Sequence, residues 1–388
     1  MSETVLAARV GALHRSGIRA VMALAAQRER AGKPVIHLEV GQPDFPTPAH
    51  ILDAACRAMQ NGLPGYTPNA GITSLREAVA ERVTRLNGRP VSVDSVCITS
   101  GAVAALQLAL LAVVEPGDEV LIPDPGWPNY RSATTLAGGV CVPYPLNPVR
   151  GFAIDLDALA ARISARSRVL MLNSPGNPTG AVFTAEQVAS VLALAEQHGL
   201  YVLSDEVYED LVFGGARHAS AFTAASSDRV ILVSGASKSY AMTGWRIGWL
   251  VAHPALAAGA AALVEPQTSC PATIAQVAAE AALRGPQDAV GTMRDAYGRR
   301  AQLAAACLEG TGLLVARPSG AFYAMLDIAR SGLDSSMFVQ RALEISGVAV
   351  APGSTFGAVA AKNVRVSLAS SDDAIREGLR RLADLLPG

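Results

Sequence analysis

The sequence predicts an α/β protein built on a mainly parallel sheet of seven strands, with a smaller α+β unit at its C-terminal end. Half of the 388 residues are hydrophobic and only 17% are charged, which excludes a disordered chain and allows a large core. From about residue 95, short apolar runs alternate with longer helical stretches, as in a sheet that helices cover on both faces. After about residue 290 the order of helices and strands changes, which favours a separate unit.

The N-terminal part combines helical periodicity with one rigid loop. Residues 1–31 are rich in Ala and Arg and place apolar side chains at helical spacing, which predicts one or two amphipathic helices. Residues 35–40 are typical of a strand. Three prolines and a glycine within residues 41–48 exclude a helix or a central strand, so we expect an ordered loop there. Helices are predicted over 48–61 and 72–87.

Short apolar runs predict the seven strands of the large sheet, over residues 96–99, 119–122, 140–142, 169–172, 201–203, 230–233 and 247–251. The C-terminal unit is predicted to hold helices over 292–308, over 335–346 and from Asp372, and strands near 313–316, 321–327, 348–351 and 364–368. We therefore expect three parts, which are an N-terminal arm with part of the small domain (1–45), a large domain (46–288) and a small C-terminal domain (289–388).

Charge and cysteine content exclude several classes of function. The 32 Lys and Arg nearly balance the 33 Asp and Glu, so we expect no nucleic-acid partner and no anionic membrane. The five cysteines are scattered, without a CxxC pair or a Cys/His cluster, which argues against a metal and against a disulfide framework. We find no membrane span and no signal peptide, and therefore expect a soluble, cytoplasmic protein.

Lysine is rare in this chain, with 29 Arg but only three Lys. A GC-rich genome explains the bias towards Arg. A lysine that remains despite this bias suggests a role that arginine cannot fill, because a guanidinium does not give up its proton in a protein. Lys238 follows a predicted strand and lies among small and hydroxylated residues. We interpret it as an imine-forming amine rather than a loop lysine, and such an amine needs burial or nearby cations to lower its pKa.

Two segments are suited to an anion such as phosphate. Arg246 lies eight residues after Lys238 among apolar neighbours, where its charge needs an anion. Phosphate is a good candidate because a planar guanidinium binds it bidentately, and a structural ion pair is the alternative. Residues 99–103 join a strand to a helix through small residues, which leaves backbone N–H groups to bind an anion.

A carboxylate and a tyrosine follow the strand at 201–203, at the strand end where open α/β sheets bind ligands. A buried Asp205 can keep a pyridine nitrogen protonated, and Tyr208 can hydrogen-bond to a ring oxygen. Glu206 is the competing carboxylate, but Asp205 stands nearer to the strand and is the better candidate.

Two stiff loops supply further candidates. Asn177 precedes Pro178 in a loop with two prolines and two glycines, which fixes its amide, although a simple turn asparagine is equally compatible with the motif. Trp127 lies in another proline-rich loop, where it either stacks on a flat ring or fills the loop core.

In their order and spacing, these motifs resemble the class I/II pyridoxal-phosphate aminotransferases of fold type I, the aspartate aminotransferase-like family. The resemblance extends from about residue 35 to the end, through the segments NSPGNPTG, SDEVYEDLVF, SGASKSYAMTGWRIGW, PSGAFYAML, PGSTFG and NVRVSLA. It implies a pyridoxal 5′-phosphate cofactor in the large domain, amino acid and 2-oxo acid substrates, ping-pong transfer of an amino group, and a homodimer with shared active sites.

The resemblance also implies a role for each matching residue. Lys238 resembles the lysine that holds the cofactor as a Schiff base and later shuttles the proton at Cα. Asp205 resembles the partner of the pyridinium nitrogen. Asn177 and Tyr208 match the partners of the ring hydroxyl, and Trp127 matches the stacking aromatic.

The same resemblance places the two anionic groups. The phosphate cradle is matched by Ser237, by Arg246 and by the loop formed by Gly101, Ala102 and Val103. Tyr66 matches a tyrosine that reaches the phosphate of the neighbouring subunit. Arg365 resembles the arginine that grips the substrate α-carboxylate, with help from Asn177, Trp127 and the Gly41 backbone.

At Val103 the sequence departs from several aspartate-specific relatives, which carry a lysine at that position. Because an apolar side chain cannot bind the second carboxylate of a dicarboxylic acid, we expect a neutral or aromatic amino donor, with 2-oxoglutarate or pyruvate as the acceptor. Arg15, Arg19 and Arg131 are candidates for another cation that reaches the site.

Other functions share this fold and this lysine. β-Lyases, such as C–S lyases, and other pyridoxal-phosphate enzymes break different bonds at the same carbon, and a lyase would release ammonia. A ligand-binding regulator with an aminotransferase-like domain would need a DNA-binding module, for which about forty residues before Gly41 are too few. A degenerate binding protein would lack one of Lys238, Asp205 or Arg365, and all three are present.

Overall fold

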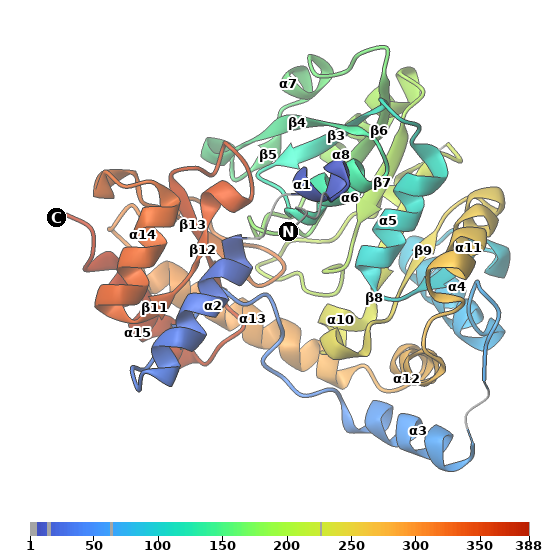
Figure 1. The fold of residues 1–388 in the computed structure, drawn as a ribbon, viewed down its shortest axis with the longest axis horizontal. Helices are drawn as coiled ribbons and strands as arrows, with labels where there is room; N and C mark the ends of the chain where they lie inside the picture. Colours follow the sequence, from blue (N-terminus) through green and yellow to red (C-terminus); the bar gives the residue numbers. More distant parts are fainter. Residues whose placement is uncertain (1–5, 14–16, 63–64, 226, 388) are drawn as a thin grey trace, which may run out of the picture.

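The computed structural model describes residues 6–13, 17–62, 65–225 and 227–387. Two lobes are visible in Figure 1, a large one around a long sheet and a small one that gathers the C-terminal elements and the N-terminal helix α2 (Gly17–Arg30). The short helix α1 (Ala8–Gly11) precedes α2. Helix α13 (Asp288–Cys307) runs from one lobe to the other (Figure 1).

The large lobe is built on one eight-stranded sheet in the order β2-β9-β8-β7-β6-β3-β4-β5. Its strands are β2 (Val96–Thr99), β3 (Glu119–Asp124), β4 (Val140–Asn147), β5 (Ala153–Ile154), β6 (Ser167–Asn173), β7 (Tyr201–Asp205), β8 (Val230–Gly235) and β9 (Gly248–Val251). Five of these strands run parallel to one another, namely β3, β4, β6, β7 and β8. Strand β9 pairs antiparallel with β2 and β8, and β5 pairs antiparallel with β4. The predicted mainly parallel sheet is confirmed, and the strand that the prediction lacks is β5, whose two residues are too few to form a pattern.

Helices cover both faces of this sheet because successive strand residues point to opposite sides. Val120 and Ile122 face a core formed with α5 (Ala102–Val113), α6 (Asn129–Leu136) and α11 (Pro254–Thr268). Leu121, between them, faces the opposite side. That side is covered by α3 (Ala49–Gln60), α4 (Thr73–Asn87), α7 (Leu156–Ala160), α8 (Ala185–Gln197) and α12 (Thr273–Arg284). The short helices α9 (Ala221–Ala224) and α10 (Ala236–Ser239) flank strand β8.

The small lobe combines two small sheets with helices. The first sheet is antiparallel, in the order β10 (Tyr323–Asp327), β13 (Asn363–Ser367) and β12 (Ala351–Pro352). The second pairs β1 (Ile36–His37) in parallel with β11 (Val348–Ala349). The helices of this lobe are α14 (Ser335–Arg341) and α15 (Asp372–Ala383), together with α2 and most of α13.

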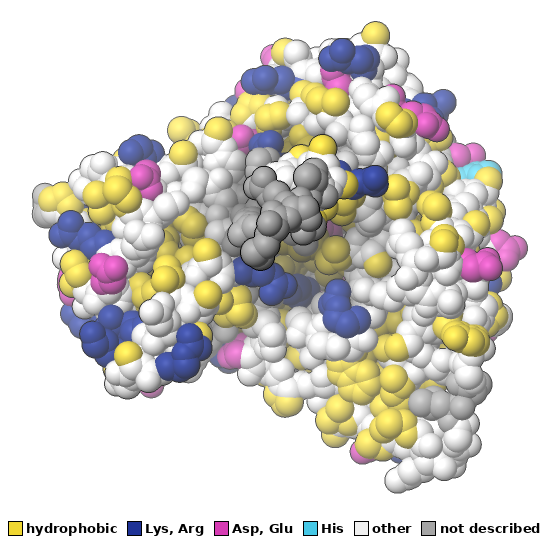
Figure 2. Space-filling model, in the orientation of Figure 1, with side chains coloured by type: hydrophobic (Ala, Val, Ile, Leu, Met, Phe, Trp, Pro, Cys, Tyr) yellow, Lys and Arg dark blue, Asp and Glu magenta, His cyan; other side chains and the backbone are white. Residues whose placement is uncertain are grey.

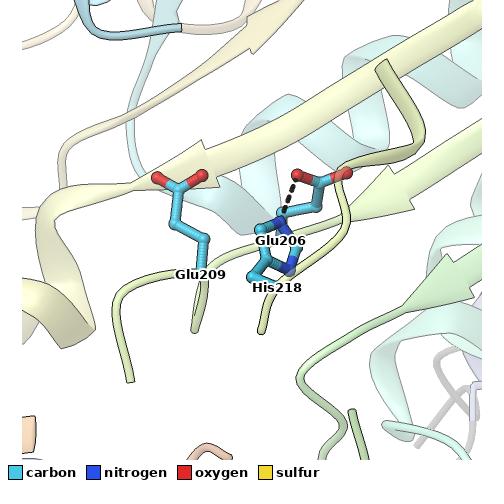
Figure 3. A group of neighbouring side chains, drawn as sticks. All are labelled: Glu206, Glu209 and His218. Atoms are coloured by element: carbon cyan, nitrogen blue, oxygen red, sulfur yellow. Dashed lines mark hydrogen bonds and ion pairs between the residues drawn. The ribbon is translucent and has the colours of Figure 1, made fainter. Parts of the chain in front are cut away.

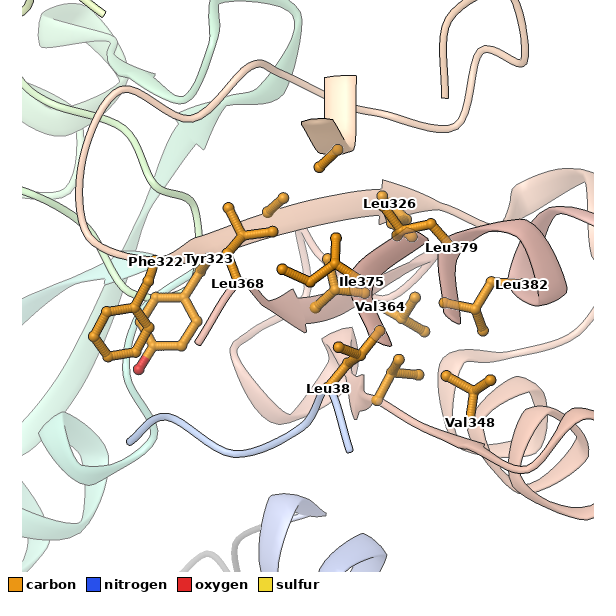
Figure 4. Close-up of a cluster of buried hydrophobic side chains, with 14 of the residues drawn as sticks. Leu38, Phe322, Tyr323, Leu326, Val348, Val364, Leu368, Ile375, Leu379 and Leu382 are labelled. Atoms are coloured by element: carbon orange, nitrogen blue, oxygen red, sulfur yellow. The ribbon is translucent and has the colours of Figure 1, made fainter. Parts of the chain in front are cut away.

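One hydrophobic core joins the ends of the chain. Leu38 from the N-terminal arm packs with Val348, Val364 and Ile375 of the C-terminal elements (Figure 4). Phe322 and Tyr323 extend the same core towards the large lobe (Figure 4), where it includes residues after strand β7. Along α13, Val290 belongs to a large-lobe core and Met293 to the small-lobe core, so the helix changes lobe within its first two turns. The domain boundaries at residues 45 and 288 stay a prediction.

Four predicted elements differ from the structure. The strand predicted over 348–351 is divided into β11 and β12, which belong to different sheets. The strand predicted at 313–316 is a single bridge, Leu314 to Leu326, because Pro318 and preceding glycines with positive φ interrupt the chain. The helix predicted over 335–346 ends at Arg341 and continues as a π-helical turn to Ser346, before Gly347 at φ 66°. The strand predicted over 35–40 is reduced to β1, because Leu38 already bonds to two different strands. Among the described helices, even α13 lacks the apolar length that a bilayer crossing needs.

Candidate active site

A cavity of about 370 Å³ lies where the two lobes meet, at the carboxyl ends of β6 and β7 and beside α10. Figure 2 shows Lys and Arg side chains around the hollow between the lobes. Most of the predicted site residues line it, namely Gly41, Ala102, Val103, Trp127, Asn177, Asp205, Tyr208, Ser237, Lys238, Arg246 and Arg365. Two do not, because Gly101 is buried just before α5 and Tyr66 is 89% exposed at the surface. Of the cations proposed to compensate for Val103, Arg19 lines the cavity, Arg131 does not, and Arg15 lies outside the described residues.

Lys238 projects from α10 directly after strand β8. Its Nζ donates a hydrogen bond to the Gly41 carbonyl oxygen at 2.5 Å. The pKa of Lys238 is lowered to about 8, mainly by burial and also by the positive charges of Arg365 and Arg246, while Asp205 opposes the shift. A substantial fraction of this amine is therefore neutral near pH 8 and able to act as a nucleophile.

Asp205 ends strand β7 and is buried at the floor of the cavity. Its Oδ2 accepts a hydrogen bond from the Tyr130 hydroxyl at 2.7 Å, and its Oδ1 accepts one from the Val207 N–H at 3.3 Å. Burial raises the pKa of Asp205 to about 6, and the Tyr130 bond opposes that rise. The carboxylate is thus mostly ionised at neutral pH and available to a cationic ring nitrogen.

The competing carboxylate, Glu206, points away from the cavity into a cluster with His218 and Glu209 (Figure 3). Glu206 Oε1 accepts hydrogen bonds from Ser204 and Ser220 hydroxyls and from a backbone N–H, while Oε2 pairs with His218 Nε2 at 2.8 Å. Ligand atoms of the three residues lie within 4.8 Å of one another, but Glu209 is already paired with an arginine. The cluster therefore holds the loop after Asp205 in place, and Asp205 is the carboxylate that faces the cavity.

Arg365 of β13 is only 1% exposed and reaches the cavity from the small lobe. Its Nη1 donates to Asn177 Oδ1 at 3.0 Å and its Nη2 donates to the Glu39 carbonyl oxygen. The guanidinium carbon lies 4.4 Å from the centroid of the Tyr323 ring. Its Nε is buried and has no hydrogen-bond partner among the described residues. A buried cation with an unused hydrogen-bond donor is suited to bind an anionic ligand.

Tyrosines that the sequence did not single out complete the floor of the site. The Tyr208 and Tyr323 hydroxyls are hydrogen-bonded to each other at 2.8 Å, and burial raises the pKa of both. Tyr130 stands with its ring edge-on to Trp127, with centroids 5.7 Å apart. Tyr323 lies within the segment PSGAFYAML, but the sequence assigned no role to Tyr323 or to Tyr130, because both acquire their roles through partners distant in the sequence.

The end of the cavity near α5 is suited to phosphate. The helix starts at Ala102, so its first backbone N–H groups and its dipole face an anion there. Ser237 and Arg246 line the same cavity, and Arg246 is held at φ 54° with its Nη1 on the Thr243 carbonyl oxygen at 2.9 Å. Strand β9 approaches closely, since a Cβ on Gly248 would lie 2.5 Å from the Ala102 nitrogen.

Comparisons with known proteins give this geometry a family. The model of the family described as aminotransferase class I and II matches residues 33–382. This chain belongs to that family. It is 38% identical over 384 residues to the aspartate/prephenate aminotransferase of Thermus thermophilus, covering 98% of each chain. It is 36% identical to the arginine–pyruvate transaminase of Pseudomonas aeruginosa, covering 92% of this chain and 91% of the relative.

Solved structures of aminotransferases have the same fold. A Thermus thermophilus aspartate aminotransferase double mutant superposes with a TM-score of 0.94 at 39% identity, covering 99% of this chain and 100% of the other. The aromatic aminotransferase of Pyrococcus horikoshii superposes with a TM-score of 0.88 at 37% identity, covering 93% and 98%. The chain is therefore an aminotransferase that depends on pyridoxal 5′-phosphate and acts on amino acids and 2-oxo acids.

The donor set of this aminotransferase fits that cofactor. The cavity offers an amine with a lowered pKa for the aldehyde, a buried carboxylate for the ring nitrogen, and a helix start with an arginine for the phosphate. These three groups lie at one cavity although they come from separate strand ends of the large sheet. The unused Nε of Arg365 leaves a donor for a further anion, as an amino acid substrate requires.

Proposed function

We propose that this aminotransferase transfers the amino group of a neutral or aromatic L-amino acid to a 2-oxo acid by a ping-pong mechanism in which Lys238 is the central residue. The observation that carries the proposal is the buried Lys238 amine, with its pKa lowered to about 8, in the same cavity as Asp205 and Arg365. Bound pyridoxal phosphate supplies a ring that accepts electrons from the substrate Cα. Lys238 would hold the cofactor through its amine.

The Lys238 amine would act as the base that takes the Cα proton and later returns it. Its place in the cavity supports this role, because the Gly41 carbonyl holds Nζ close to the arm that covers the site. Arg365 binds the α-carboxylate, aided by Asn177 and the Gly41 backbone. Holding the α-carboxylate with Arg365 and Asn177 would orient the Cα–H bond of the substrate towards Lys238. Such orientation raises the rate by lowering the entropy lost on reaching the transition state.

The remaining residues hold and tune the cofactor. Asp205 keeps the ring nitrogen protonated, and its ionised state at neutral pH supports that role. Asn177 and Tyr208 bind the ring hydroxyl, and Trp127 stacks on the ring. Ser237, Arg246 and the start of α5 bind the phosphate.

A homodimer with shared sites is part of the same proposal. Tyr66 is 89% exposed and does not line its own cavity, as expected for a side chain that serves the neighbouring subunit. The cytoplasmic location is also a proposal, and the five free cysteines support it.

The donor class follows from the wall of the cavity. Val103 stands there 38% exposed, and Ile18 and Met22 line the same cavity, so much of the wall near the mouth is apolar. Such a wall favours a neutral or aromatic side chain.

The proposal is tested by single-turnover spectroscopy of the holoenzyme with a panel of amino acids. We expect alanine, aliphatic or aromatic donors to convert the cofactor to its aminated form and to release a 2-oxo acid. Release of ammonia instead would show a lyase. If aspartate aminated the cofactor much faster than every other donor, the proposed specificity would be wrong. If Lys238→Arg kept full activity, the proposed role of Lys238 would be wrong.

A further inference from the structure

Two hydrogen bonds to one buried carboxylate fasten a loop of the small lobe to the end of strand β3. The loop joins β12 to β13 over residues 353–362, and we call it the Phe356 loop. Asp124, the last residue of β3, is only 5% exposed. Its Oδ2 accepts a hydrogen bond from the Ala358 N–H at 3.0 Å, and its Oδ1 accepts one from the Val359 N–H at 3.1 Å. Asp124 therefore joins the two lobes.

The backbone around this carboxylate fits closely. The Gly126 N–H donates a further bond across the lobes, to the Phe356 carbonyl oxygen at 2.8 Å. Gly357 has a φ of 142°, which favours glycine, and a Cβ on it would overlap with the Asp124 carboxylate. Bonds from backbone N–H groups to a carboxylate are charge-assisted and about twice as strong as neutral ones. Asp124 is thus the group that fixes the Phe356 loop.

The loop that Asp124 fixes carries an aromatic ring to Arg365. The Phe356 side chain is 3% exposed, and its ring centroid lies 5.0 Å from the guanidinium carbon of Arg365. The Tyr323 ring contacts the same guanidinium, at 4.4 Å. Because aromatic faces attract a guanidinium, these two rings restrict where it lies. A displaced Phe356 would remove one of these restraints.

Asp124 also begins the loop that carries Trp127. Only Pro125 and Gly126 separate the two residues, and Trp127 lines the cavity. The same carboxylate therefore lies between the side chain proposed to stack on the cofactor and the ring that contacts Arg365. Transamination needs the substrate α-carboxylate at a fixed place relative to the cofactor ring, because that place orients the bond at Cα.

We propose that Asp124 is a positioning residue for the substrate α-carboxylate, and that it acts through Phe356 on Arg365. This inference rests on the proposed function, in which Arg365 binds the α-carboxylate and Trp127 stacks on the cofactor. Asp124 lies outside the residues that line the cavity and does its work by holding the Phe356 loop against the loop of Trp127. The distance between the cofactor ring and the guanidinium is set in this way.

The first test compares Asp124→Asn with Asp118→Asn in the holoenzyme. Asn has the size of Asp, but its amide accepts only one of the two N–H bonds and turns a donor towards the other N–H. Asp118, just before β3, also accepts a bond from a backbone N–H, that of Glu115 at 2.9 Å, and lies outside the cavity lining. Two quantities are measured, the Kd of valerate, a monocarboxylate without an amino group, and single-turnover kcat/KM for alanine.

We expect Asp124→Asn to raise the Kd of valerate and to lower kcat/KM for alanine, each about tenfold, because a charge-assisted bond is lost. The affinity of the cofactor-free protein for pyridoxal phosphate should stay unchanged, and Asp118→Asn should change none of the three values. An equal weakening of valerate and of the cofactor would show a general structural defect and overturn the inference. An unchanged Kd of valerate in Asp124→Asn would also overturn it.

A double-mutant cycle tests whether Asp124 acts through Phe356. Phe356→Leu keeps an apolar side chain and removes the ring face, so it should weaken valerate to a similar degree. If both residues act on one contact, the double variant should be no weaker than the weaker-binding single variant, whereas independent effects would multiply. Multiplying effects would overturn the inference. Gly357→Ala, whose Cβ displaces the Asp124 carboxylate, replaces Asp124→Asn in the cycle if that variant does not fold.

Arg365→Lys separates this inference from the function on which it rests. If Arg365→Lys weakens valerate and Asp124→Asn does not, only the role of Asp124 is wrong. If Arg365→Lys leaves the Kd of valerate unchanged, the proposed role of Arg365 in binding the α-carboxylate is itself wrong.

Discussion

Replacing Tyr130 with Phe removes one hydroxyl and little else. The Tyr130 side chain is 1% exposed, and its hydroxyl donates to Asp205 Oδ2 at 2.7 Å. The ring keeps its edge-on contact with Trp127, because Phe fills the same space. The change therefore withdraws a charge-assisted hydrogen bond from a buried carboxylate without opening a cavity.

The magnitude follows from the charge on the acceptor. A hydrogen bond to a charged group is worth about 1.5–3 kcal/mol, and one pKa unit corresponds to about 1.4 kcal/mol, so losing this bond should raise the pKa of Asp205 by about one to two units. Burial already raises the pKa of Asp205 to about 6 in the cofactor-free protein. In Tyr130→Phe we therefore expect a pKa of roughly 7 to 8.

The sign of the pH dependence is fixed by that shift. The pKa of Asp205 in the folded state lies above its usual value of 3.8, so its ionisation costs stability above about pH 6, and the cost is relieved as the pH falls. Tyr130→Phe increases the cost only where Asp205 is ionised. Relative to wild type, the variant should lose about 1.5–3 kcal/mol of unfolding free energy at pH 8.5 and much less at pH 5.

The assay is denaturant unfolding of the cofactor-free protein at the two pH values, with Tyr144→Phe as the matched control. Tyr144 is fully buried and its hydroxyl donates to the uncharged Met171 carbonyl oxygen at 2.7 Å, so its loss should be independent of pH. Titration with pyridoxal phosphate at neutral pH should also show weaker binding to Tyr130→Phe, because a protonated Asp205 no longer stabilises a cationic ring nitrogen. A stability deficit for Tyr130→Phe that is equal at both pH values would refute the reasoning.

Three other substitutions test separate parts of the site. Lys238→Arg should lower the transamination rate by at least about 10²–10⁴-fold although the charge is kept, because a guanidinium cannot become a neutral base; single-turnover absorbance is the measurement. Arg365→Lys should raise KM about 10- to 100-fold for every amino donor, since a bidentate pair is lost, and a rise confined to one donor would contradict its role. Val103→Lys should increase kcat/KM for aspartate relative to alanine, because it adds a cation at a cavity position that is 38% exposed; an unchanged ratio in the donor panel would place the side-chain pocket elsewhere.

The residues that could be predicted share a local signal. Lys238, Asp205 and Asn177 each follow a strand of the parallel sheet, and the carboxyl ends of such strands meet at one edge. Their types are also unusual for those loops, which made them candidates before any fold was known. The helices and strands around them follow the same logic, because their apolar spacing is repeated over several turns or residues.

The residues that could not be predicted depend on tertiary contacts. Tyr130 lies on α6 and meets Asp205 only because β7 ends beside that helix in the folded protein. Tyr323 meets Tyr208 across 115 positions of sequence. Arg19 was weighed among other arginines, and only the packing of α2 on the small lobe shows that it lines the cavity. The strand expected at 313–316 failed for a related reason, since a bridge of one residue pair needs a partner that periodicity does not reveal.

The arrangement of charge explains why the site lies between the lobes. Arg365 is buried in the small lobe, and Lys238 is half-buried in the large one. Burial lowers the pKa of both groups, and the charge of Arg365 also lowers the pKa of Lys238. Two such cations repel unless anions separate them, and Asp205 supplies only part of that compensation. A phosphate at the start of α5 and a carboxylate on Arg365 would supply the rest. Substrate and cofactor would therefore stabilise the contact between the lobes electrostatically. An amine with the same side chain but no carboxylate should bind poorly.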